Sequence, residues 1–183
     1  MKETKKLTIS AMAIALGVAF MTLGAFVEVL DLTVAAITSC IMAFIFIEVG
    51  KPYTYFVWLG TSILTFVFFP HSFTWVTYLL VFGIYPILKA YIERTKRVFW
   101  IPLKLLFFNV SAPLMIIASE YLLGIPFFGE DVVFPIFEEN TLAFKIGIYL
   151  GLIVALMLYD LFMTFMIRAY FSSIRKRIER ILK

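Results

Sequence analysis

Residues 7–27, LTISAMAIALGVAFMTLGAFV, decide the fold class of this chain. The stretch has no charged side chain, and as an α-helix it would be about 30 Å long at about 1.5 Å per residue. That length matches the hydrocarbon core of a bilayer, which is about 30 Å thick. The apolar run is longer than that of a usual signal peptide, and no convincing small-x-small cleavage site precedes Glu28. The stretch is therefore predicted to be the first membrane helix.

The composition of the whole chain supports this interpretation. Of its 183 residues, 63% are hydrophobic and 15% are charged, and the mean hydropathy is +1.01. Soluble domains are about half apolar and about a quarter charged, so we expect an integral membrane protein. The single cysteine, Cys40, lies in an apolar run, which excludes an intrachain disulfide and argues against a metal site.

Helix-stopping residues divide the chain into six apolar segments. Gly50, Lys51 and Pro52 end the second segment, and Pro70 ends the third. The predicted helices cover residues 7–27, 32–48, 53–69, 73–93, 98–123 and 142–170, and a basic amphipathic tail follows at 171–183. We therefore predict an all-α integral membrane protein with one membrane domain at 1–183, a single bundle of six transmembrane helices.

Six crossings would place both chain ends on one side of the membrane, and the charged residues then separate by side. One side receives Lys2, Lys5, Lys6, Lys51, Arg94, Lys96, Arg97, Arg168, Arg175, Lys176, Arg177, Arg180 and Lys183. The other receives Glu28, Asp31, Glu130, Asp131, Glu138 and Glu139, with Lys145 as the only nearby cation. The positive-inside rule makes the basic side, and so both termini, cytoplasmic. The same rule explains the net charge of +4 without nucleic-acid binding.

Small residues recur every four positions in two of the predicted helices. Ala11, Ala15 and Ala19 form one ridge along the first helix, and Gly147, Gly151 and Ala155 form another along the sixth. In lipid, a ridge of small residues lets a second helix approach closely. Two interpretations of the first ridge stay open, packing inside the bundle and a docking face for a partner protein.

Two charged residues lie well inside predicted helices. Asp160 is about two turns inside the sixth helix, and Lys104 is at a similar depth in the fifth. Charges at such depths face the bundle interior and pair with one another. We predict an ion pair or a shared polar network between Lys104 and Asp160, acting either as a clamp between two helices or in transport.

A candidate solute site is expected on the outward side. Prolines at 86 and 113 interrupt backbone hydrogen bonding in the fourth and fifth helices, the first at the carbonyl of Phe82. Asn109, near the bilayer midplane, is either a solute ligand or a structural amide. The candidate substrate-binding residues are Asn109, Trp75, Tyr78, Trp58, His71, Phe127 and Glu130. For the aromatic rings, the alternative is an interfacial belt.

No catalytic constellation occurs in the chain. It has no nucleophile elbow, no HExxH and no phosphate-binding loop, and it contains one histidine and one cysteine. We therefore predict that it is not an enzyme and that it needs no cofactor and no metal. The expected partners are a small solute and membrane lipid, and no nucleic acid.

The order of these features resembles the substrate-binding S components of energy-coupling factor (ECF) transporters. The resemblance rests on AMAIA at residues 11–15, which follows LTIS at 7–10 and a basic N-terminus, together with six membrane helices and inward termini. In that family an alanine-x-x-x-alanine motif of the first helix docks on the energising module. The resemblance implies an outward pocket for a vitamin or similar solute, and ATP hydrolysis by partner ATPases acting through a membrane-embedded scaffold subunit in a bacterial plasma membrane.

A second function class stays open beside this one. Small bacterial cell-shape scaffold proteins of the MreD type also have a few membrane helices, short loops and no catalytic motif. Such a scaffold would use the ridge from Ala11 to Ala19, or the basic tail, for assembly. An enclosed outward pocket near the midplane, lined by groups such as Asn109 and Trp75, would distinguish a transporter from a scaffold.

Overall fold

The computed structural model describes residues 2–27, 30–124 and 141–174 of the chain. Within these ranges the chain forms helices and no strand, and its helical segments correspond to the six predicted ones. Each segment begins and ends within four residues of its predicted range. The prediction of an all-α bundle is confirmed.

The helices follow one another along the chain with short connections. α1 spans Glu3–Phe26, α2 spans Asp31–Glu48 and α3 spans Lys51–Phe68. The fourth segment consists of α4 at Phe73–Thr77, a π-helical turn at Tyr78–Phe82 and α5 at Tyr85–Ile92. After a 3-10 turn at Arg97–Phe99, α6 spans Trp100–Leu123. α7 spans Thr141–Ala169 and continues as a π-helical turn at Tyr170–Ile174.

The fourth segment is broken where the sequence places a glycine and a proline. The N–H of Gly83 donates to the carbonyl of Tyr78 at 2.7 Å and ends the π-helical turn. α5 then begins with Pro86 in its first turn. The N–H groups of the first turn have no acceptor within the helix, so a proline, which has no N–H, costs no hydrogen bond there. α6, in contrast, continues through Pro113 as one helix and ends at Gly124, whose φ of +66° is the left-handed conformation that glycine favours.

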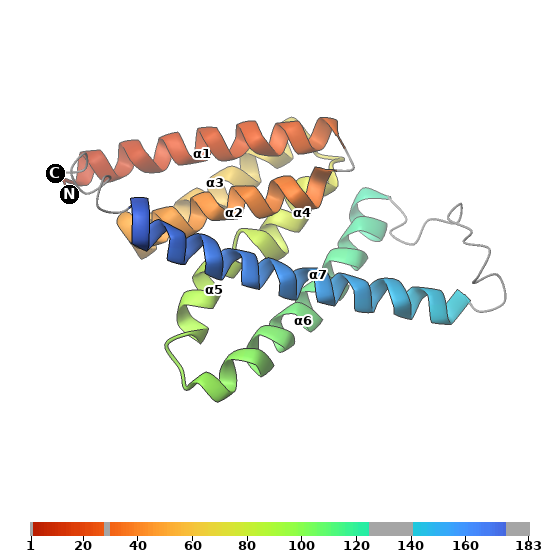
Figure 1. Cartoon of the computed structure of the whole chain (residues 1–183). Helices are drawn as coiled ribbons and strands as arrows, with labels where there is room; N and C mark the ends of the chain where they lie inside the picture. Colours follow the sequence, from red (N-terminus) through yellow and green to blue (C-terminus); the bar gives the residue numbers. More distant parts are fainter. Residues whose placement is uncertain (1, 28–29, 125–140, 175–183) are drawn as a thin grey trace.

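Figure 1 shows α1, α2, α3 and α7 running in roughly one direction, whereas α4, α5 and α6 are inclined to them. α1 packs against α2 and α3, while α5 and the π-helical turn connect α2 to α6. α7 contacts α6 and α2, and its first half extends beyond the other helices (Figure 1). At Gly147 and Gly151, in that half, a built Cβ would meet no described atom within 4 Å. The close packing expected of the ridge on α7 is therefore not seen among the described residues.

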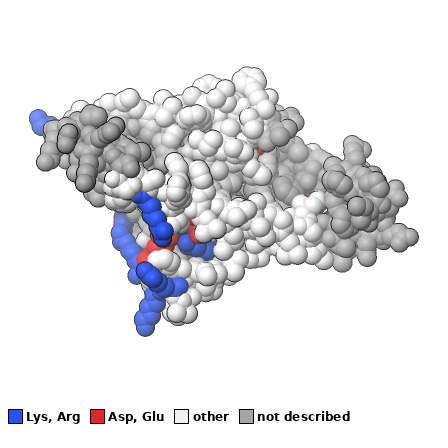
Figure 2. Space-filling view, in the orientation of Figure 1, with Lys and Arg blue, Asp and Glu red and all other residues white. Residues whose placement is uncertain are grey.

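One end of the bundle, which we call the basic end, joins the start of α1 to the end of α7 (Figure 1). Contacts between helix ends hold it together: Tyr53 donates to Glu3, Lys51 lies 4.6 Å from the centroid of the Tyr91 ring, and Tyr170 donates to Glu48 at 2.9 Å. Figure 2 shows Lys and Arg side chains gathered at the lower left of the molecule, while most of the remaining described surface is uncharged. Asp31, at the start of α2, lies at the opposite end.

Five helical stretches in the described residues are long and apolar enough to cross a membrane, which indicates a multi-pass membrane protein. α3 is not among them, although the sequence predicted six crossings. Lys51 and the tyrosines of its first turns lower its mean hydropathy, and its hydroxyl residues Thr54, Thr61, Ser62 and Thr65 are buried against the other helices.

The bundle carries large apolar side chains on its outside and many small hydroxyl groups inside. Met12, Phe56 and Phe165 are each more than two-thirds exposed, as expected of side chains that face lipid. Some of the buried hydroxyls bond backward within their own helix, as Thr65 does to the carbonyl of Thr61 at 2.8 Å. Small polar residues at helix contacts let the backbones approach closely in an apolar solvent.

Candidate functional site

The alanine ridge of α1 faces outward. Ala11, Ala15 and Ala19 are all exposed. The helix packs into the bundle through a different set of residues: Ser10, Ala13, Gly17, Met21 and Gly24. The two sets are offset by about two residues, which places them on roughly opposite sides of the helix at about 100° per residue. Among the described residues the ridge is therefore exposed and is not the face through which α1 packs into the bundle.

Glycine decides which face of α1 turns inward. A Cβ at Gly17 would lie 3.1 Å from both Cγ2 and Oγ1 of Thr61 on α3, and 3.4 Å from Cγ2 of Thr38 on α2. These distances are at or below van der Waals contact, so α1 approaches both neighbours only because the position has no side chain. The alanines of the ridge are exposed in the described part of the chain, and Ala15 and Ala19 line a groove that α1 shares with α2.

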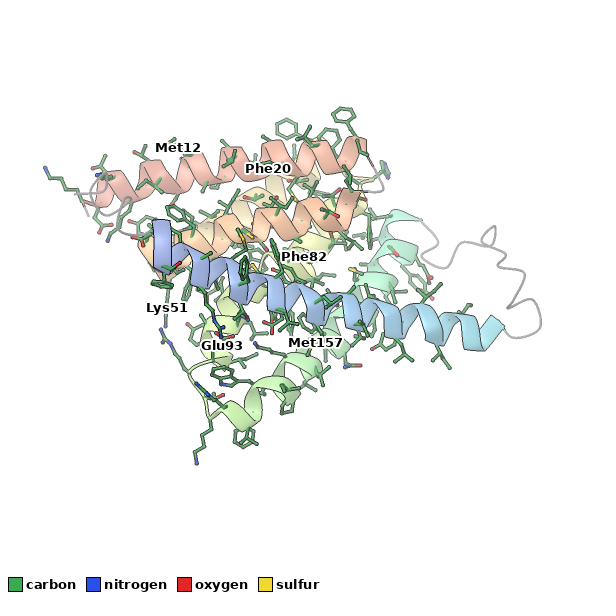
Figure 3. All side chains as sticks on the ribbon, viewed as in Figure 1. Met12, Phe20, Lys51, Phe82, Glu93 and Met157 are labelled. Carbon is green, nitrogen blue, oxygen red and sulfur yellow. The ribbon has the colours of Figure 1, made fainter. Side chains whose placement is uncertain are left out.

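An apolar groove of about 840 Å³ runs beside the ridge, between α1 and α2. Its walls include Ile9, Met12, Leu16 and Ala19 of α1 and Cys40 and Phe44 of α2. Met12 points away from the bundle (Figure 3). A smaller cavity of about 120 Å³ lies between α2 and α7 and also contacts Cys40 and Phe44.

A second candidate site is a buried cluster of charges where α5, α6 and α7 meet. The structure brings together the two residues that the sequence paired: Lys104 Nζ lies 2.8 Å from Asp160 Oδ2. Both side chains are buried, with exposed fractions of 5% for Lys104 and 6% for Asp160. Tyr85 also donates to Asp160, at 2.6 Å.

Lys89 is the member of this cluster that the sequence reasoning missed. It lies on α5, is 1% exposed and pairs with the Asp160 carboxylate. Its ammonium group also donates to Thr164 Oγ1 at 2.7 Å. The signal was available, because a lysine inside an apolar segment of the fourth helix is as unusual as Asp160 in the sixth.

Glu93 completes the cluster at the end of α5 (Figure 3). Its Oε1 lies 2.9 Å from Lys89 Nζ and 3.0 Å from Lys104 Nζ. The cluster therefore holds two ammonium groups and two carboxylates, and its formal charge sums to zero. Because each charge has hydrogen-bonding partners, this arrangement is suited to joining three helices rather than to binding a further ion.

The predicted solute-binding residues within the described ranges line neither the groove nor the smaller cavity. Asn109 is exposed, and its amide donates to the carbonyl of Leu105 and accepts from Tyr149 at 2.9 Å. Tyr78 is fully buried in the π-helical turn, and its hydroxyl finds no hydrogen-bonding partner in the described part of the chain. Neither the groove nor the smaller cavity is lined by these two residues.

The remaining predicted ligands have separate environments. Trp75 is buried and donates to the carbonyl of Pro70 at 3.1 Å, while Trp58 donates to the carbonyl of Leu79 at 3.3 Å. His71 is exposed. Phe127 and Glu130 lie outside the described residues.

Comparison with known proteins gives no match to this chain, whether against protein-family models, curated proteins or solved structures. The features of this chain that bear on its function are the outward ridge of α1, the groove beside it and the buried charges.

Proposed function

We propose that this chain is the substrate-binding membrane subunit, or S component, of an ECF-type transporter that takes up a vitamin or a similar small micronutrient. The observation that carries the proposal is the outward orientation of Ala11, Ala15 and Ala19 on α1. A ridge of small residues that faces lipid is available to a helix of another protein, whereas one that packs inside is not.

The arrangement of helix ends supports the same proposal. The start of α1, the turn between α5 and α6, and the end of α7 carry most of the basic residues of the described chain. If this end faces the cytoplasm of a bacterial cell, the ridge begins near the cytoplasmic surface. Partner ATPases and the scaffold subunit that joins them to the membrane would then approach α1 from that side.

Co-purification tests this proposal. The tagged chain is expressed with a bacterial energising module, and the scaffold subunit and both ATPases are expected in the eluate. Ala15→Trp places a large ring on the ridge and should remove them. Val110→Trp, at an exposed position of α6, is the matched control and should retain them.

A specific observation favours the scaffold of the MreD type as the second candidate. Tyr78 is buried, Asn109 is exposed, and neither lines the groove or the smaller cavity, whereas a solute carrier would be expected to have a midplane pocket lined by such groups. Failure to recover any of several compatible energising modules with the unchanged chain would refute the S component proposal. Recovery of cell-shape proteins on the same ridge, lost in Ala15→Trp, would support the scaffold.

A further inference from the structure

We propose that the turn between α5 and α6 binds the phosphate of an anionic phospholipid. The turn joins two of the helical stretches that are long and apolar enough to cross a membrane, the first of which ends at Ile92 and the second of which begins at Arg97. Residues 93–96 are all that separates them. Because the connection is so short, the turn lies at the membrane surface, at the depth of the lipid headgroups.

The exposed part of the turn is positively charged. Arg94, Lys96 and Arg97 are all exposed, and within the described ranges none of them forms an ion pair with a carboxylate. Glu93, the one carboxylate of the turn, lies between two ammonium groups of the buried charge cluster, at 2.9 and 3.0 Å. The turn therefore favours an anionic headgroup over a zwitterionic one, whose own ammonium group these cations repel.

Aromatic rings on both sides of the turn hold the two guanidinium groups. The guanidinium of Arg94 lies 5.8 Å from the centroid of the Tyr91 ring, and that of Arg97 lies 5.9 Å from the centroid of the Trp100 ring. The Trp100 indole also donates to the carbonyl of Thr95 at 3.1 Å, which ties the start of α6 to the turn. A guanidinium held over a ring keeps N–H donors at its edge for the bidentate binding of a phosphate.

Apolar side chains directly after the cations favour a lipid over a soluble anion. Val98, Phe99 and Ile101 are each more than half exposed. At the membrane surface these side chains enter the hydrocarbon next to the headgroups, and the long stems of the basic residues let their charged ends reach the phosphates. A lipid satisfies both parts of the turn, because its phosphate meets the cations while its acyl chains meet the apolar side chains.

Native mass spectrometry of the purified chain tests this inference. The chain is titrated with phosphatidylglycerol or with phosphatidylcholine of the same acyl chains, and the bound lipids are counted. At least a severalfold preference for phosphatidylglycerol is expected. Arg97→Gln should reduce this preference about fivefold, the factor that corresponds to about 1 kcal/mol for one basic residue near a membrane surface. Lys2→Gln, which removes an exposed basic residue just before α1, is the matched charge control and should leave the preference unchanged.

Further variants separate a phosphate site from diffuse attraction. Lys96→Gln leaves both ring contacts intact and should lower the preference by a similar factor, so the test survives if Arg97→Gln does not fold. Val98→Ser should weaken retention of phosphatidylglycerol, whereas Ile63→Ser, at an exposed position of α3, should not. Equal retention of both lipids, equal losses in Arg97→Gln and Lys2→Gln, or displacement of the lipid by excess inorganic phosphate would overturn the proposal. All these measurements use the isolated chain, so their outcome is independent of any energising module.

Discussion

Replacing Asp160 by asparagine removes one charge from the buried cluster and leaves its shape unchanged. In the structure the Asp160 carboxylate accepts from Tyr85 at 2.6 Å and from Lys104 at 2.8 Å, and it pairs with Lys89. After the substitution, two buried ammonium groups share the single carboxylate of Glu93. A buried charge that has lost its partner keeps its desolvation cost without the compensating attraction.

The size of the effect follows from this imbalance. Breaking a buried ion pair by removing one partner costs about 3–5 kcal/mol of unfolding free energy. For a chain of this length, about 1 kcal/mol corresponds to about 2–4 °C in the midpoint of thermal unfolding. Asp160→Asn is therefore expected to lower that midpoint by about 6–20 °C.

Thermal unfolding in detergent, followed by size-exclusion chromatography of the heated samples, measures this shift. Glu120→Gln, which removes a carboxylate from an exposed position of α6, is the matched control and should shift the midpoint little. Adding Lys104→Met to Asp160→Asn leaves Lys89 paired with Glu93, so the double variant should regain most of the loss. An Asp160→Asn midpoint equal to that of Glu120→Gln would refute the clamp.

Two glycine positions offer further tests by the same measurement. Gly17→Val should destabilise the bundle by about 1–3 kcal/mol, because the valine side chain would collide with Thr61. Gly147→Val is the control and should change the midpoint little, because a side chain there meets no described neighbour. Equal shifts in the two variants would contradict the assigned packing face of α1. Gly83→Ala should lower the midpoint of thermal unfolding by a similar amount, since a Cβ there meets the Trp58 ring and the backbone carbonyl of Tyr78 at 2.8 Å. An unchanged midpoint would contradict the close approach at the π-helical turn.

Much of the fold was predictable because its determinants are local. Hydrophobic runs and the breakers between them defined six helices to within four residues, and the turn at Pro86 followed from a missing N–H. The ion pair between Lys104 and Asp160 was predictable because few partners exist for a charge at that depth. Lys89 was not predicted as a member of the cluster, although it also lies inside an apolar segment. The position of a solute site was not predictable, since residue type and depth do not determine that Asn109 is exposed and Trp75 is buried.

The sequence by itself determined that this is a helical membrane protein, because apolar length and composition are properties of each segment. It also determined that α1 carries small residues every four positions. Only the tertiary structure decided which stripe turns inward, because Ala13 and Gly17 form a stripe as regular as Ala11 and Ala15. The choice depends on where Thr61 lies, about forty residues further along the chain, and it leaves the alanine ridge and the groove beside it facing the membrane.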